Sequence, residues 1–305
     1  MNVRLTHLDG KLPNMALMKL SQAHRQRGDQ VWFTRSEYRE LFEPEFGKVY
    51  GSTIFTKTRD KLETFKREFP EAIVGGTGSE STRTVEDETG EVDGLDYSIY
   101  PKFEQSIGFS QRGCRLKCGF CVVPKKEGRN QDNETIKSIW RGEGHPKEIV
   151  LLDNDFFGQP DWQSKINEII EGGFKINFNQ GINVRLIKPE SARELARVNY
   201  YDVRFNRRSI YTAFDNPRDE RIFMRGFDIM RDAGIPAYRI VVYMLVGYWP
   251  GETLTDVMDR FQKIIDLGAF AYPMVYNNEN KELKKFQRWV VRRYYQFIPF
   301  EQYKS

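Results

Sequence analysis

Cysteine is scarce in this sequence, with only three among 305 residues. An odd number of cysteines argues against a disulfide framework and favours metal or redox chemistry in a reducing compartment. The sequence also lacks any apolar run near the ~20 residues that a membrane helix requires, and its first residues lack the apolar centre of a secretory signal. We therefore expect a cytoplasmic protein that does not contact a membrane.

The sequence has no large excess of one charge, since 47 Lys and Arg stand against 43 Asp and Glu, for a net charge of +4. With 39% hydrophobic and 14% aromatic residues and no low-complexity tract, the composition excludes general disorder. Domains usually contain ~100–200 residues. The length therefore predicts one large domain with a smaller appendage.

Apolar periodicity predicts a small α/β domain over residues 1–95. The predicted strands cover residues 3–8, 31–33, 49–55 and 72–74. Helical spacing between them ends at Gly28 and at Pro70. Strands that alternate with helices through short connections favour a parallel sheet. The polar and acidic segment 79–94 is predicted to be a solvated linker.

Strands and helices alternate on a larger scale over residues 96–278. The predicted strands cover 106–109, 148–152, 175–178, 201–205, 209–214, 239–246 and 271–276. The predicted helices cover 134–140, 162–171, 191–198, 219–233 and 254–267. Repeated units of this kind predict an α/β domain, either an open sheet or a partial or full barrel. In both architectures, ligands bind at the carboxyl ends of the strands.

The C-terminal segment 279–305 has a different composition. It contains seven Lys or Arg and three Glu, so its net charge of +4 equals that of the whole chain. Its aromatic residues are mixed with basic ones, a pattern that can bind the phosphates and bases of a nucleic acid. Phe286, Trp289, Val290 and Arg293 also recur at helical spacing, which is typical of a helix packed on a core. Packing is the favoured interpretation, and nucleic acid remains a candidate partner.

All three cysteines lie close together, at Cys114, Cys118 and Cys121. A structural zinc site would need a fourth ligand. The candidates for it are the three histidines, His7, His24 and His145. Buried core cysteines are a second interpretation, opposed by the charged Arg115 and Lys117 between them. The third is an iron–sulfur cluster held by thiolates, in which three cysteines leave one of four irons free to bind a small molecule.

The spacing Cys-x3-Cys-x2-Cys, with Phe120 before the last cysteine, resembles the signature of the radical S-adenosylmethionine superfamily. The resemblance implies a partial (β/α) barrel with a 4Fe-4S cluster on Cys114, Cys118 and Cys121, whose free iron chelates S-adenosyl-L-methionine. It further implies reductive cleavage of that cofactor to a 5′-deoxyadenosyl radical, which abstracts hydrogen from an unidentified substrate. An electron donor such as a flavodoxin or ferredoxin is then an expected partner.

The resemblance extends over most of residues 106–276 and implies further cofactor-binding residues. Asp153 and Asn154 follow the second strand and would face the cofactor's amino group, unless they only stabilise a solvated turn. Gln180 and Arg185 follow the strand that usually meets the ribose, and the alternative for Arg185 is a surface ion pair.

Two later segments also resemble the superfamily. Asp215 ends the predicted strand 209–214, where an acid is usual, and Val246 lies in the strand whose backbone is near the adenine in relatives. Glu252 belongs to a Pro-Gly-Glu-Thr turn and is interpreted as part of a helix cap. No side chain stands out as a catalytic acid or base.

Residues 1–78 resemble the cobalamin-binding domain that precedes the radical domain in one branch of the superfamily. The resemblance rests on Pro13–Leu17 and Gly75–Thr77. The Asp-x-His-x-x-Gly motif of other cobalamin proteins is absent, and glycines occur wherever a sheet turns tightly. We therefore expect a degenerate Rossmann-like domain that shapes the substrate entrance, with cobalamin as a further candidate cofactor. The whole chain resembles an uncharacterised group of such proteins from bacteria and their phages.

The main hypothesis from the sequence is therefore a radical S-adenosylmethionine enzyme. One alternative is a cobalamin-dependent methyltransferase of the same superfamily. The other is a non-catalytic protein that binds nucleic acid and whose cysteines hold zinc or a sensing cluster.

Overall fold

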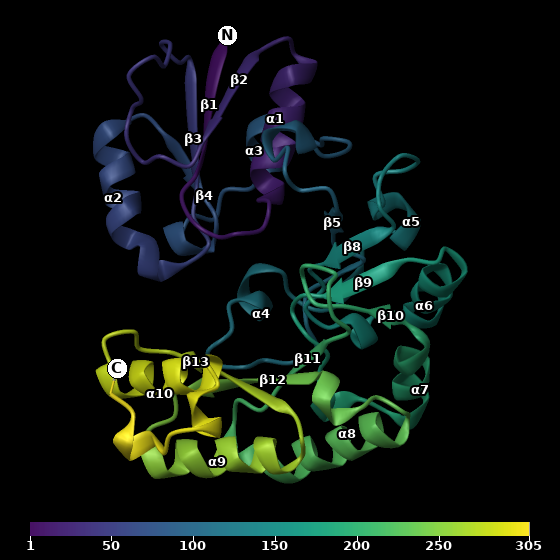
Figure 1. Ribbon diagram of the computed structural model, residues 1–305. Coiled ribbons are helices and arrows are strands. Elements are labelled where there is room, and N and C mark those ends of the chain that lie inside the picture. Colours follow the sequence, from purple (N-terminus) through teal and green to yellow (C-terminus); the bar gives the residue numbers. More distant parts are fainter. Residues whose placement is uncertain (305) are drawn as a thin grey trace. The chain divides into compact units, whose positions relative to one another are not determined.

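The chain forms two compact units in the computed structural model, which describes residues 1–304 apart from the side chain of Asp132. The first unit is Met1–Glu104, and the second unit begins at Gln105 (Figure 1). Both units are built from parallel sheets and helices, which confirms the predicted α/β class. Within the described residues, no helix combines the length and the apolar character needed to cross a bilayer.

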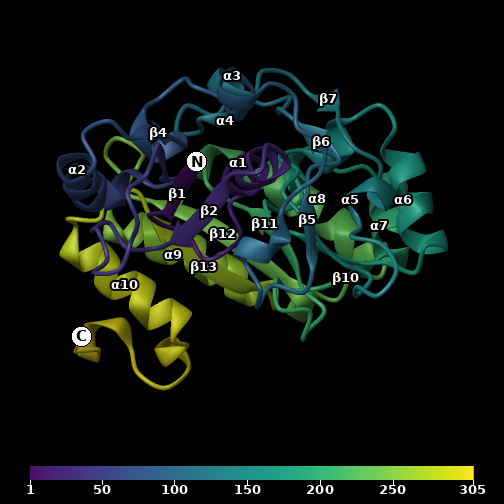
Figure 2. The same ribbon diagram turned by 90° about the horizontal axis from the view of Figure 1, so that it is seen from above.

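The first unit contains a four-stranded parallel sheet with the strand order β2-β1-β3-β4. Its strands are β1 (Asn2–His7), β2 (Gln30–Thr34), β3 (Lys48–Ser52) and β4 (Ile73–Gly75). Its longer helices are α1 (Met15–Gln26) and α2 (Arg59–Glu68). These two helices lie on opposite sides of the sheet (Figures 1 and 2). A short helix, α3 (Val85–Thr89), lies in the expected linker and begins with a capping box formed by Thr84 and Asp87.

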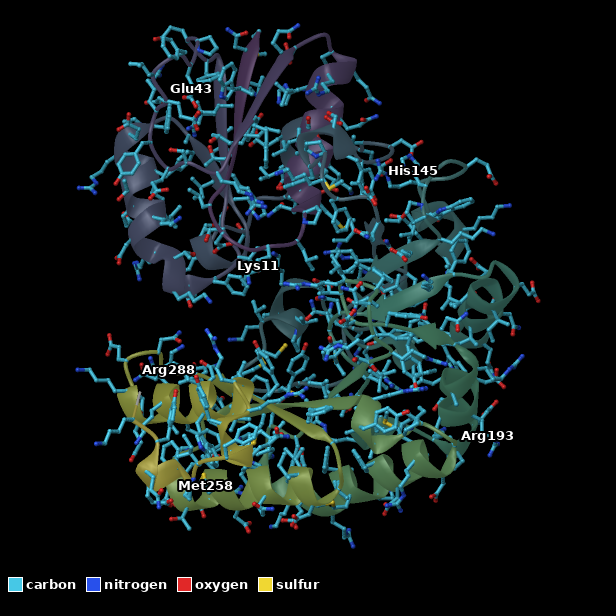
Figure 3. All side chains as sticks on the ribbon, viewed as in Figure 1. Lys11, Glu43, His145, Arg193, Met258 and Arg288 are labelled. Atoms are coloured by element: carbon cyan, nitrogen blue, oxygen red, sulfur yellow. The ribbon has the colours of Figure 1, made fainter. Side chains whose placement is uncertain are left out.

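A buried ion pair connects an inner strand of this sheet to the loop between β2 and β3. Arg4 on β1 donates from Nε to both carboxylate oxygens of Glu43 at 3.0 Å, and both side chains are fully buried. Glu43 lies in the loop between β2 and β3 (Figure 3). Because a buried charge requires a partner, this pair ties the long loop to the sheet.

The second unit contains two larger parallel sheets. The first has the order β10-β9-β8-β5 and the second the order β11-β12-β13. The strands are β5 (Ser106–Gly108), β8 (Glu148–Leu151), β9 (Lys175–Phe178), β10 (Asn199–Tyr200), β11 (Ile210–Ala213), β12 (Ile240–Val246) and β13 (Phe270–Val275). A short antiparallel pair, β6 (Gln111–Arg112) and β7 (Gln131–Asp132), flanks the cysteine-containing segment between them.

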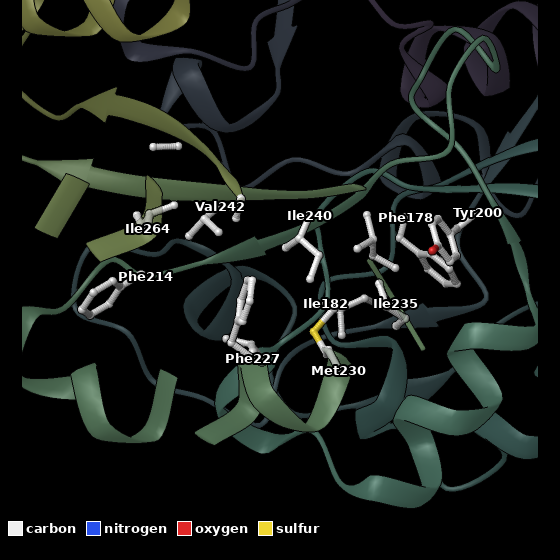
Figure 4. Close-up of a cluster of buried hydrophobic side chains, with 14 of the residues drawn as sticks. Phe178, Ile182, Tyr200, Phe214, Phe227, Met230, Ile235, Ile240, Val242 and Ile264 are labelled. Carbon is white, nitrogen blue, oxygen red and sulfur yellow. The ribbon is translucent and has the colours of Figure 1, made fainter. Parts of the chain in front are cut away.

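Most helices of the second unit follow its strands on their outer side, whereas α4 (Val123–Lys126) follows the cysteine-containing segment (Figure 1). The others are α5 (Ile136–Ile139), α6 (Trp162–Glu171), α7 (Pro189–Arg197), α8 (Glu220–Asp232), α9 (Leu254–Asp266) and α10 (Lys281–Val291). Between strands and helices lies one continuous apolar core, part of which Figure 4 shows. Ile240 and Val242 of β12 face Phe227 and Met230 of α8 in this core, because alternate strand residues point to the same side.

One sequence prediction in this unit is wrong, and the bounds of another are too wide. The predicted strand 201–205 is a turn, in which Phe205 has a positive φ of 56° and the Asp202 carboxylate accepts a hydrogen bond from the Asn206 backbone. The actual strand, β10, ends at Tyr200. The predicted helix 134–140 is shortened to α5, because Thr135 serves as its N-cap and accepts a hydrogen bond from the Ser138 backbone.

The C-terminal segment packs on the core of the second unit. Phe286 and Val290 of α10 and the neighbouring Trp289 are at most 5% exposed and belong to the apolar core. This confirms the predicted packing of these three residues. Arg293 lies beyond the end of α10, with its guanidinium carbon 4.4 Å from the centre of the Phe270 ring, so it is not part of the buried helix face.

Candidate functional site

A cavity at the carboxyl ends of β8, β9 and β11 brings together most of the side chains that the sequence singles out. These are Cys114, Cys118, Phe120, Cys121, Asn154, Gln180, Arg185 and Asp215. They come from four separate loops, and the parallel direction of the strands places those loops at one edge. The polar side chains therefore surround the thiols from several directions.

The cysteine loop, residues 113–121, is anchored at its beginning. Gly113 has a positive φ of 77°, and a Cβ there would lie 2.2 Å from the Arg129 carbonyl oxygen, so only glycine fits. Its backbone N–H donates to the Glu127 carboxylate at 3.1 Å. The Cys114 N–H donates to the Gly128 carbonyl at 3.2 Å. The segment 127–129 thus holds the start of the loop in place.

Asp155 is the main anchor of the loop, and the sequence did not single it out. Its carboxylate accepts hydrogen bonds from Nε and Nη2 of Arg115 at 2.7 and 3.0 Å, and from Asn130 at 3.2 Å. Its own backbone N–H donates to Gln111 at 3.1 Å. The Asp155 side chain is 1% exposed. The sequence feature that points to Asp155 is Arg115, because a cation between two cysteines calls for a carboxylate partner.

Arg185 contacts the thiol site directly. Its Nη2 lies 3.5 Å from the sulfur of Cys118, and its Nη1 donates to the Asp219 carboxylate at 2.9 Å. Burial opposes the charged form, but the bonds to Cys118 and Asp219 prevail and raise the Arg185 pKa above its usual range. The ion pair that was the alternative for Arg185 is therefore present, and the side chain also faces a cysteine, whereas its contact with the cofactor stays a prediction.

The adjacent residues Asp153 and Asn154 lie in different surroundings. Asn154 lines the cavity and donates to Glu127 at 3.0 Å. Asp153 is 3% exposed, lies outside the cavity lining and accepts hydrogen bonds from the backbone and hydroxyl of Ser110. Burial raises the Asp153 pKa to about 7. The hydrogen bonds between Asp153 and Ser110 connect the end of β5 to the end of β8.

Asp215 and Phe120 are positioned by β12 and by the segment that follows it. The Leu245 backbone donates to the Asp215 carboxylate at 2.9 Å, and burial raises the Asp215 pKa. The Phe120 ring packs edge-on against Tyr248, with 5.4 Å between ring centres. Val246 is fully buried in the core, outside the cavity lining.

Glu252 supports this segment from behind. Its carboxylate accepts a hydrogen bond from the Gly247 backbone at 2.7 Å and another from Arg260 at 2.6 Å. The side chains of Glu252 and Arg260 are 2% and 3% exposed. Arg260 also donates to the carbonyls of Phe214, Asp215 and Leu245. Glu252 is thus structural, as predicted, and Thr253 provides the N-cap of α9.

The three thiols could serve as ligands of an iron–sulfur cluster. Among the side chains that the structure describes, no three His, Cys, Asp or Glu groups converge on one ion. A cluster needs only thiolates that surround a larger body, and all three cysteines are free and line the same cavity. Burial raises the pKa of Cys114 and Cys121, so these thiols gain from a cationic partner that stabilises the thiolate.

Two of the candidate fourth zinc ligands have partners of their own. Nδ1 of His7 lies 3.0 Å from the Tyr100 hydroxyl. The His24 ring lies between Asp29 and Tyr50, at 2.7 and 3.2 Å.

No known protein-family profile matches the chain. A search of curated proteins finds similarity to the ribosomal protein uS12 methylthiotransferase RimO of Clostridioides difficile (strain 630), with 26% identity over 191 residues. The match covers 52% of this chain and 41% of that protein. The chain therefore spans about two fifths of the relative's length. This similarity supports the radical S-adenosylmethionine superfamily as the general class of enzyme.

Proposed function

We propose that the second unit holds a 4Fe-4S cluster on Cys114, Cys118 and Cys121 and cleaves S-adenosyl-L-methionine reductively, to abstract hydrogen from a substrate. The observation that carries the proposal is the single cavity shared by the three thiols, Asn154, Gln180, Arg185 and Asp215. When bound, the cluster would supply the electron that breaks the sulfonium bond and yields a 5′-deoxyadenosyl radical. In this proposal, the two parallel sheets of the second unit correspond to the partial (β/α) barrel.

The polar residues of the cavity have distinct parts in this proposal. Asn154 and Gln180 present amide groups that can bond to the amino, carboxylate and hydroxyl groups of the cofactor. Arg185 places a positive charge 3.5 Å from the Cys118 sulfur, where it stabilises the negative charge of thiolate ligands. Phe120, packed on Tyr248, contributes apolar surface to the same cavity and so helps to exclude water from it.

An acidic electron donor fits a second cavity beside the cysteine loop. This cavity is lined by Cys114, Arg115, Lys117, Pro124, Gly128, Arg129 and Asn130. Three of these side chains are cations, of which Arg115 is paired with Asp155, and none of the lining side chains is a carboxylate. Electrostatic complementarity favours partners of opposite charge, so a flavodoxin or ferredoxin with an acidic surface suits this cavity.

The first unit supports a degenerate role better than cobalamin binding. At the carboxyl ends of β1 and β3, where a Rossmann-like sheet binds its ligand, the Asp9 carboxylate accepts hydrogen bonds from the hydroxyls of Thr53 and Thr58. It also accepts backbone bonds from Ile54 and Phe55 at 2.8 Å. These internal contacts occupy polar groups that a bound cofactor would otherwise use. We expect purified protein to take up no cobalamin.

Anaerobic reconstitution with iron and sulfide tests the proposed function. We expect about four irons and four sulfides per chain, and 5′-deoxyadenosine after dithionite and S-adenosyl-L-methionine are added. Cys118→Ala should abolish the product. Arg185→Gln should lower the yield, whereas Arg193→Gln, on the outer side of α7 (Figure 3), is the matched control and should not. A chain with one zinc and no iron or sulfide, or a loaded cluster that gives no 5′-deoxyadenosine with any reductant, would refute the proposal.

A further inference from the structure

A cavity of about 590 Å³ lies at the amino ends of β11, β12 and β13. These are the strand ends opposite to those that carry the candidate functional site. The cavity is lined by four arginines, Arg207, Arg208, Arg239 and Arg293, and by no Asp or Glu. Arg207 and Arg208 precede β11 and Arg239 precedes β12, so the parallel strands place these three at one edge, and Arg293 joins them from the C-terminal segment. The sheet therefore collects positive charge at this edge.

These guanidinium groups are only partly neutralised by the protein. The carboxylate nearest to Arg207 is that of Asp202, at 3.7 Å, and Arg207 is 73% exposed. Arg208 donates from Nη2 to the Val198 carbonyl at 2.7 Å, but its Nε is buried without a hydrogen-bond partner. A buried donor without an acceptor is costly. An anion in the cavity would offset the mutual repulsion of the arginines.

Aromatic rings accompany the arginines. The guanidinium of Arg239 lies 5.4 Å from the centre of the Tyr238 ring, and Tyr238 and Tyr272 are 61% and 41% exposed. A planar guanidinium that stacks on a ring keeps its N–H groups free to bond at its edge. Exposed rings beside cations provide the two elements that bind single-stranded nucleic acids, since bases stack and phosphates pair with the charge.

We propose that this cavity binds single-stranded nucleic acid, with phosphates on the arginines and a base on Tyr238. A strand fits better than a free nucleotide, because basic and aromatic surface continues on both sides of Arg293 in the chain, where Arg292 is exposed and Phe297 is 80% exposed. The inference does not depend on the proposed function, because binding is measured without S-adenosyl-L-methionine and with or without iron.

Fluorescence anisotropy of the full chain with a labelled single-stranded oligonucleotide of about a dozen nucleotides tests this inference. We expect the binding to weaken as the salt concentration rises. If the four arginines contact phosphates, a plot of log K against the logarithm of the salt concentration should have a slope of about −2 to −3. Arg207→Gln/Arg239→Gln should weaken binding at least tenfold. Tyr238→Ala, on a separate and exposed side chain, should weaken it severalfold at unchanged salt slope.

The matched control is Arg193→Gln/Arg221→Gln, which removes the same charge from exposed positions of α7 and α8. Affinity should change less than twofold. Equal losses in the two double variants would mean diffuse attraction to a basic protein and would overturn the site. Absence of binding by the folded wild-type chain, or competition by a mononucleotide as strong as that by the strand, would overturn the proposal as well.

Discussion

Arg115 and Asp155 form a two-point ion pair behind the cysteine loop, with Nε and Nη2 of Arg115 at 2.7 and 3.0 Å from the two carboxylate oxygens of Asp155. The pair joins a residue between the first two cysteines to the turn that follows β8. Because a bidentate pair fixes both distance and orientation, the positions of the three thiols depend on a carboxylate about 40 residues away in the chain.

Asp155→Asn should therefore loosen the cysteine loop. The amide keeps one acceptor oxygen but loses the charge, so we expect a loss of about 1–3 kcal/mol in the free energy of unfolding. Under the proposed function, the iron bound after reconstitution should fall as well. Urea unfolding and iron analysis measure the two effects. Asp228→Asn, which breaks an exposed pair with Arg231, should change neither, and equal iron content in both variants would contradict the anchoring role.

Gly226→Ala should destabilise the second unit although alanine favours helices. A Cβ at Gly226 in α8 would lie 2.1 Å from the Val184 carbonyl oxygen, so the turn that carries Arg185 would have to move. The steric cost should exceed the roughly 1 kcal/mol that alanine gains in helix propensity. Thermal unfolding shows whether the variant is less or more stable than the wild type. Asp228→Ala, on an exposed face of the same helix, controls for propensity, and a stabilised Gly226→Ala variant would disprove the close contact.

Asp153 should make stability depend on pH near neutrality. Its pKa rises from 3.8 to about 7 because burial disfavours the carboxylate, against hydrogen bonds from Ser110 and Gln111 and the charge of Lys165. Protonated Asp153 stabilises the folded chain fully at a pH below the pKa of this residue in the unfolded chain. This stabilisation is lost as the pH rises through about 7, the pKa in the folded chain. Between pH 5.5 and 8 the loss should be about 2 kcal/mol.

Asp153→Asn should remove this pH dependence, because an amide can bond to Ser110 without ionising. Urea unfolding at the two pH values compares the variant with wild type. The exposed Asp161→Asn is the control and should keep the wild-type slope. If the stability of Asp153→Asn fell with pH as steeply as that of the wild type, the titrating group would be a residue other than Asp153.

Arg260→Leu should be among the most damaging substitutions. It leaves the Glu252 carboxylate buried without its cation and removes the donor for the carbonyls of Phe214, Asp215 and Leu245. Breaking a buried pair on one side costs about 3–5 kcal/mol. Arg231→Leu, in an exposed pair with Asp228, should cost at most about 1 kcal/mol. Similar urea midpoints for the two variants would contradict the importance of the buried network.

The helices and strands were largely predictable where their bounds follow from a local pattern of apolar and polar residues. The helix α6 matches its predicted bounds, and the strands of the second unit are shifted by a residue or two, except at 201–205. There, the alternation of apolar and charged residues favours a strand, but the Asp202 carboxylate accepts hydrogen bonds from backbone N–H groups of the following turn, and the strand ends before it. Side-chain bonds to the backbone of this kind compete with the sheet, and their outcome depends on geometry that spacing does not contain.

The amino-acid sequence by itself determined the three thiols and their spacing, because Cys114, Cys118 and Cys121 lie in one short loop. It also determined the alternation of strands and helices, since that pattern follows from periodicity along the chain. Only the tertiary structure decided which polar side chains reach the thiols. Asn154 faces the cavity while the adjacent Asp153 is buried against Ser110, and Asp155 anchors Arg115. Neighbours in sequence are separated in this way because the direction of each side chain is set by the strand end and by packing against other segments.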